Sequence, residues 1–132
     1  MIAGHVPDIA PLFAGARVSI SPLRYGAGVK GKINLAMSYG LPVVATTPSI
    51  EGMHLSPELD VLVADDSVAF AQAIARVYHD ETLWHRLAEG GRANIRQHFS
   101  RDVARNALAA VLARTHGDRR ASAREGRLVN AV

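Results

Sequence analysis

Apolar residues along this chain form short continuous runs that are separated by stretches of helical spacing. The runs at 41–45 and 61–64 are apolar throughout, which is typical of strands buried in a parallel sheet, and 17–21 is expected to be a short strand that ends before Pro22. Over 30–39 and 68–79 the apolar residues recur every three or four positions, and this spacing predicts amphipathic helices. The order of these elements predicts an α/β fold, a Rossmann-like parallel sheet with flanking helices.

Polar residues and glycines indicate where the remaining elements begin and end. Asp65, Asp66 and Ser67 precede the helix over 68–79 and are expected to cap it. The segment Thr47–Asp60 contains two prolines and is expected to be a loop. A helix is expected to open at Asp80 and Glu81, and the pair at 90–91 is expected to kink or break it. A last helix should run from about Ser100 to Arg114.

Length and composition indicate one small globular domain. The 132 residues are 48% hydrophobic, which is enough for a core, and no apolar run approaches the roughly 18 residues of a membrane span. We expect the folded domain to cover residues 1–115 and residues 116–132 to form a disordered basic tail. The absence of cysteine and of a signal-peptide pattern favours a cytoplasmic location.

The distribution of charge argues against nucleic acid as a partner. Five arginines and two acidic residues in 114–132 account for the whole net charge of +3, so the remainder is balanced. The chain has only seven aromatic residues, and no basic stripe is interleaved with them. The six histidines show no metal-ligand spacing, and no metal or other cofactor is expected.

The loop at 22–29 carries the clearest chemistry. It follows a predicted strand, it contains Gly26 and Gly28, and Lys30 opens the next helix. The first turn of a helix has unpaired N–H groups and a positive dipole end, so such a loop suits a phosphate. A cation at the start of a helix is unfavourable unless an anion is nearby, which makes Lys30 a candidate phosphate ligand.

Two other interpretations of this loop fit its residues less well. Gly26-Ala-Gly-Val-Lys-Gly31 matches G-x-G-x-x-G, but four residues separate it from the strand, and Val43–Thr47 offers no acidic residue for a ribose. Gly26, Gly31 and Lys32 also approach a P-loop, but Ile33 stands where the magnesium-binding Ser or Thr is required.

A third interpretation comes from a family resemblance. Pro22-Leu-Arg-Tyr-Gly-Ala-Gly-Val-Lys-Gly-Lys32, then Ala36-Met37, Gly40-Leu-Pro-Val-Val-Ala-Thr46 and Glu51-Gly52, closely resemble the group 1 glycosyltransferases. The resemblance covers about residues 2–112. It implies the C-terminal, donor-binding half of a retaining enzyme of two facing Rossmann-like domains, the GT-B architecture. The chain is therefore expected to be incomplete and inactive alone.

The resemblance also implies site residues. The donor diphosphate would be bound by loop and helix-start residues, namely Arg24, Gly26, Gly28, Val29 and Lys30. Many members carry two glutamates eight positions apart, the second for the ribose, but Ala27 and Leu35 stand there in this chain. Contact to the ribose or sugar is therefore expected from Asn34, Glu51 and Gly52, while the catalytic residues remain unknown.

The resemblance implies transfer of a sugar from a nucleoside-diphosphate sugar to an acceptor. The acceptor would be a carbohydrate or a lipid-linked molecule bound by a separate N-terminal domain, and peripheral membrane association would involve parts outside this chain. Two alternatives stay open: a non-catalytic nucleotide- or phosphate-binding module, and a truncated remnant that acts as a scaffold.

Overall fold

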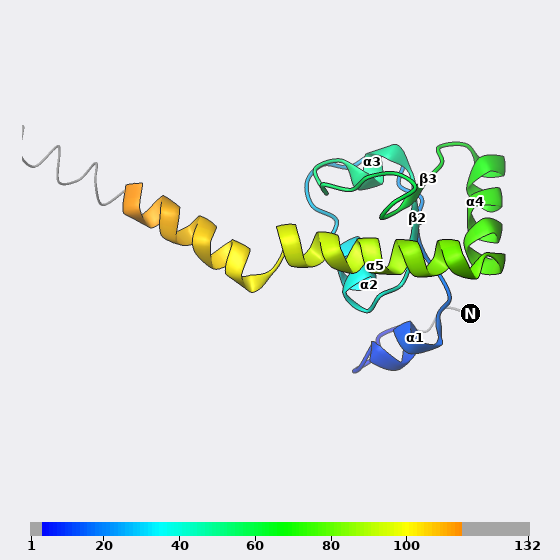
Figure 1. Cartoon of the computed structure of the whole chain (residues 1–132), viewed down its shortest axis with the longest axis horizontal. Coiled ribbons are helices and arrows are strands. Elements are labelled where there is room, and N and C mark those ends of the chain that lie inside the picture. The colour runs from blue at the N-terminus through cyan, green and yellow to red at the C-terminus, as the bar shows by residue number, and fades with distance from the viewer. Residues whose placement is uncertain (1–3, 115–132) are drawn as a thin grey trace, which may run out of the picture. The chain divides into compact units, whose positions relative to one another are not determined.

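The computed structural model describes residues 4–114, which fall into two compact units divided between His98 and Phe99. The elements of the first unit alternate between helix and strand up to a final pair of helices (Figure 1). In chain order they are α1 (Ala10–Gly15), β1 (Ser19–Ser21), α2 (Gly31–Ser38), β2 (Val43–Ala45), α3 (Thr47–Ile50), β3 (Leu62–Val63), α4 (Ser67–His79) and α5 (Glu81–His98).

The three strands form a parallel sheet in the order β1-β2-β3. Ser19 pairs with Val43, and Val44 pairs with Leu62. All three strands of this sheet therefore end at one edge, where the loops that follow them meet. The parallel α/β sheet predicted from the sequence is confirmed.

Helices cover both faces of the sheet (Figure 1). Val43 and Ala45 belong to a core cluster with Ile33 and Met37 of α2, whereas Val44 belongs to a second cluster with residues of α4 and α5. Side chains alternate along a strand, so the central strand buries both of its faces. Helix α5 contacts both α4 and α2, and it thereby joins the two layers.

Two expectations about local structure are wrong. Residues 47–50 form the short helix α3 instead of loop, with Pro48 in its first turn, where proline is tolerated. Helix α5 runs without a break through Gly90 and Gly91. A methyl group at position 91 would stand 3.0 Å from Met37 Cγ, so glycine there permits close packing and does not end the helix.

Several predicted boundaries are confirmed. Asp66 caps α4, and its Oδ1 accepts hydrogen bonds from the Val68 and Ala69 amides at 3.0 and 2.9 Å. In the second unit residues 101–114 are helical, and the Ser100 hydroxyl accepts a hydrogen bond from the Val103 amide. The tail expected at 116–132 lies outside the described residues. Within residues 4–114, every helix is too short or too polar to cross a membrane.

Candidate functional site

A network of buried hydroxyl groups fixes the start of the loop between β1 and α2. The Ser49 hydroxyl, at the start of α3, donates to the Ser21 carbonyl oxygen at 2.6 Å. Thr46, just after β2, donates its hydroxyl to the Leu23 carbonyl oxygen at 2.5 Å. These bonds tie the ends of β1 and β2 together, so the loop leaves the sheet edge in a defined direction.

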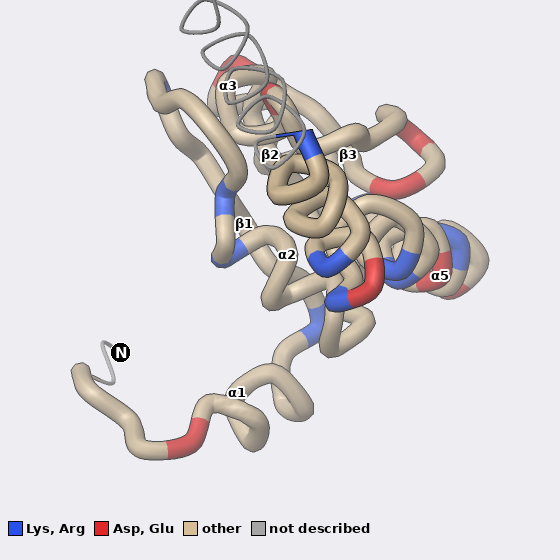
Figure 2. Tube along the Cα trace, turned by 90° about the vertical axis from the view of Figure 1, so that its left-hand side faces the viewer, with Lys and Arg blue, Asp and Glu red and all other residues tan. Residues whose placement is uncertain are grey.

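The loop itself presents free backbone donors. Between residues 24 and 32, the Lys30 amide is the only described backbone N–H with an acceptor, which is the Met53 sulfur at 3.1 Å. Gly28 has a φ of 74°, in the left-handed region where a side chain would be strained. Basic residues, blue in Figure 2, lie where this loop enters α2. Exposed N–H groups beside positive charge are the usual environment of a bound anion.

Lys30 is the most unusual residue of this region. It is the N-cap of α2 and only 8% exposed, and its ammonium nitrogen has no hydrogen-bond partner among the described residues. The end of its side chain lies beside Gly26, where a methyl group would stand 3.9 Å from Lys30 Cε. Burying a charge without a partner is costly, and an anion beside this nitrogen would offset that cost.

The other helices of the first unit begin differently. In each of them an aspartate oxygen accepts a hydrogen bond from an amide at or near the first turn. These aspartates are Asp8 for α1, Asp65 for α3, Asp66 for α4 and Asp80 for α5. No described side chain accepts a hydrogen bond from the first-turn amides of α2, and its N-cap is Lys30. Its N-terminus is therefore the one, among the described helices of this unit, that places a cation where the others place a carboxylate.

Arg24 lies in a different part of the same sheet edge. It lines two adjoining cavities of about 350 and 540 Å³ that Thr46 and Asp65 also line, and Lys30 lines neither of them. Val29 is 55% exposed on the loop. The end of the Lys30 side chain thus lies beside Gly26, whereas Arg24 lies at the cavities near the ends of β2 and β3.

The residues expected to contact the ribose or sugar flank the start of α2. Asn34 follows Lys30 by one turn, and its side-chain oxygen is buried without a partner among the described residues. Glu51 and Gly52 are exposed and directly precede Met53, whose sulfur contacts the Lys30 amide. Leu35 is 38% exposed and carries no hydrogen-bonding group.

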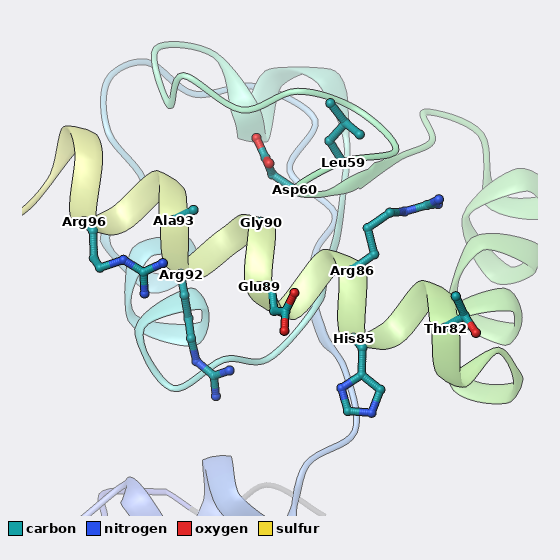
Figure 3. Close-up of a pocket in the computed structure, with 10 residues that line it drawn as sticks. All are labelled: Leu59, Asp60, Thr82, His85, Arg86, Glu89, Gly90, Arg92, Ala93 and Arg96. Carbon is teal, nitrogen blue, oxygen red and sulfur yellow. The ribbon is translucent and has the colours of Figure 1, made fainter.

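A hollow of about 870 Å³ lies elsewhere, along α5 and beside Leu59 and Asp60. Figure 3 shows its His85, Glu89 and Arg92 pointing to the same side of the helix. Two of its arginines contact other parts of the first unit: Arg86 lies 3.9 Å from Glu58, and the Arg92 guanidinium packs on Gly40, just after the C-terminus of α2. It lies away from the loop that carries the free amides, so it is not the candidate site.

Comparison with known families tests the family resemblance. A family model described as glycosyl transferases group 1 matches residues 1–80, which include the loop, all three strands and α4. The chain belongs to the group 1 glycosyl transferases. A comparison with curated proteins found no match. Membership assigns this glycosyl transferase to the transferase class, and the sheet edge with its phosphate-type loop lies inside the matched region.

Sequence reasoning missed one polar residue of the sheet edge in this glycosyl transferase. Asp65 was expected to help cap α4, but its carboxylate instead accepts hydrogen bonds from the Thr47 amide and hydroxyl, both at 2.7 Å. These two bonds hold the pKa of Asp65 below its usual range. Its position directly after the strand run 61–64 was the available signal, because the carboxyl ends of parallel strands are where ligands bind.

Proposed function

We propose that this glycosyl transferase chain binds the donor of the reaction, a nucleoside-diphosphate sugar, through the diphosphate. The observation that carries the proposal is the ammonium of Lys30, which is buried and unpaired at the start of α2. A phosphate oxygen would give this ammonium its missing partner by accepting a charge-assisted hydrogen bond. The free amides of the loop would supply further donors to the same group.

The roles of the other phosphate ligands follow from their positions. Gly26 and Gly28 allow a phosphate to approach the backbone, and Val29 would offer its amide. Arg24 would offset the second phosphate from the side of the cavities. Asn34, Glu51 and Gly52 flank the same helix start and would face the ribose or the sugar.

This arrangement would also assist the transfer step. When the sugar leaves, negative charge grows on the diphosphate that departs, and fixed cations and amides stabilise that charge more in the transition state than in the bound donor. The acceptor in this proposal is a carbohydrate or lipid-linked molecule held by another part of the enzyme. The chain by itself would bind the donor without turning it over, in the cytoplasm and with no metal.

Binding requires a local rearrangement. The Lys30 ammonium has essentially no accessible surface, and Gly26 lies beside the end of its side chain. An anion can therefore reach the ammonium only when the loop around Gly26 shifts. Glycine lowers the cost of that shift because it adopts many backbone conformations.

A second candidate is a phosphate- or nucleotide-binding module without transfer activity. Leu35 favours it, because it stands where many members of the family carry a ribose-binding glutamate, and it offers no acceptor to a hydroxyl group. Both candidates place the diphosphate at α2. They differ in whether the sugar is consumed when an acceptor-binding partner is supplied.

The proposal is tested by calorimetric titration of the full chain with UDP, GDP, ADP and their sugar derivatives. At least one diphosphate should bind, and Lys30→Ala should remove that binding, whereas Arg105→Ala in the second unit should not. Arg105 is an exposed cation paired with Asp102, so its loss matches the change in charge. Absence of binding by every diphosphate, or full binding by Lys30→Ala, would reject the proposal.

A further inference from the structure

Two adjoining cavities lie at the edge where all three strands of the sheet end. Arg24, Thr46 and Asp65 line both, and these residues follow β1, β2 and β3 in turn. Their volumes, about 350 and 540 Å³, fall within the range that small organic ligands occupy. The cavities are lined at the start of the loop that leads to α2, by Pro22, Leu23 and Arg24, so they lie on the same sheet edge as the candidate phosphate site.

Asp65 is the fixed polar group of these cavities. Its Oδ1 accepts a hydrogen bond from the Thr47 amide and its Oδ2 accepts one from the Thr47 hydroxyl, both at 2.7 Å. A carboxylate has about four acceptor positions, so one remains free on each oxygen. The side chain is exposed, and those free positions are open to a ligand.

The walls of the smaller cavity are mostly apolar. Phe70 and Ile74 of α4 and Pro22 after β1 line it together with Asp65 and Asp66. Asp66 Oδ1 accepts two amides in the cap of α4, whereas each oxygen of Asp65 accepts one hydrogen bond from Thr47, so Asp65 is the carboxylate with both oxygens oriented and one acceptor position left on each. An apolar wall beside a fixed carboxylate suits a ring that has hydrophobic C–H faces and hydroxyl groups on its rim.

We propose that Asp65 binds a vicinal pair of hydroxyl groups of the donor, one hydroxyl to each carboxylate oxygen. This inference rests on the proposed function, because the diphosphate at α2 is what directs the remainder of the donor to the cavities. A phosphate held directly against Asp65 would be repelled by its carboxylate, so the diphosphate would stay with Lys30 and Arg24 and leave Asp65 to uncharged groups of the donor. Among the described residues, no three His, Asp or Glu side chains group closely enough to hold a metal ion there. Asp65 would also accept a hydrogen bond from a ribose hydroxyl, which Leu35 cannot do.

The test compares ligands that carry and lack the hydroxyl pair, by calorimetric titration of the full chain. The probes are inorganic pyrophosphate, the nucleoside diphosphates UDP, GDP and ADP, their 2′-deoxy forms, and the corresponding sugar nucleotides. The variants are Asp65→Asn, which keeps an oxygen for the Thr47 amide, and Thr47→Val, which keeps the carboxylate but removes one of the bonds that orient it. Asp80→Asn is the control, because Asp80 also accepts a helix amide but lines neither cavity.

Asp65→Asn should weaken binding of nucleotide ligands by at least about tenfold, the loss expected for hydrogen bonds to a charged group, and leave pyrophosphate unaffected. Thr47→Val should show a smaller loss of the same kind. A loss seen with a diphosphate and absent with its 2′-deoxy form assigns the hydroxyls to the ribose. A loss seen only with sugar nucleotides assigns them to the transferred sugar.

The opposing outcomes are separate for the two proposals. If pyrophosphate binds and depends on Lys30, but Asp65→Asn binds every nucleotide as the unaltered chain does, the Asp65 inference is wrong and the phosphate site stands. Nucleotides that bind no more tightly than pyrophosphate would also overturn the Asp65 inference. If neither pyrophosphate nor any nucleotide binds, the proposed function fails and the inference falls with it.

Discussion

Gly90 of α5 lies directly against the backbone carbonyl of Leu59, in the segment that leads into β3. A methyl group at position 90 would overlap that carbonyl and stand 2.8 Å from the Asp60 carboxylate. The adjacent Gly91 makes the corresponding close contact with Met37 of α2. These two glycines let one continuous helix pack closely against both segments.

Gly90→Ala should therefore destabilise the first unit. We expect overpacking to cost about 1–3 kcal/mol, against a gain of about 1 kcal/mol that alanine brings to a helix interior, so the net loss in the free energy of unfolding should reach up to about 2 kcal/mol. Chemical denaturation followed by circular dichroism measures the change. Gly15→Ala is the control, since no described atom beyond its own helix backbone and its chain neighbours lies within 4 Å of the added methyl group there. If the two variants were equally stable, the close contact would be refuted.

Ser49→Ala should loosen the loop at its origin. Ser49 is fully buried, and its hydroxyl donates to the Ser21 carbonyl oxygen and lies within 3.0 Å of the Thr46 hydroxyl. Removing it leaves buried polar groups unpaired, at a cost of about 1–3 kcal/mol. Denaturation measures that cost, and Ser38→Ala, which removes an exposed hydroxyl bonded only to its own helix, should have little effect. A similar loss in both variants would contradict the assigned role of the network.

The contribution of Asp65 to stability should depend on pH. Thr47 lowers the folded-state pKa of Asp65, so the ionised form favours folding. This contribution is fully present above the ordinary aspartate pKa of about 3.9, and it is lost as the pH falls through the lowered folded-state value. The stability difference between the unaltered chain and Asp65→Asn should then shrink from neutral pH toward acid. Denaturation at several pH values measures it, and a difference that grows in acid would contradict the assignment.

The sequence was informative where a single local signal acted alone. Helical spacing predicted α4, Asp66 predicted its cap, and the short apolar runs predicted the parallel strands. The family followed from the loop and strand motifs taken together, and the match over residues 1–80 confirms it.

Sequence reasoning failed where tertiary contacts outweigh local preference. Glycine disfavours a helix, but α5 continues through both glycines, because the Leu59 carbonyl leaves no room for a side chain at Gly90 and Met37 packs closely on Gly91. Helix α3 has four residues, too few for any periodicity to appear. The separate roles of Asp65 and Asp66 depend on Thr47, eighteen positions away from Asp65, and such a contact leaves no trace in the local pattern.

Lys30→Met should make the unliganded chain more stable. Methionine has a similar length, and it removes a buried ammonium that lacks a partner among the described residues. We expect a gain of at least about 1 kcal/mol in the free energy of unfolding, because an unpaired buried charge opposes folding. The same change removes the cation that would hold the diphosphate, so stability and binding should move in opposite directions.

Thermal unfolding with and without a diphosphate that binds therefore tests the central claim most directly. Without ligand, Lys30→Met should unfold at the higher temperature. At a ligand concentration of about 100 times the dissociation constant, the unaltered chain should gain about 2.7 kcal/mol and Lys30→Met should gain nothing. A variant that is less stable without ligand and is stabilised equally by the diphosphate would contradict a phosphate role for Lys30.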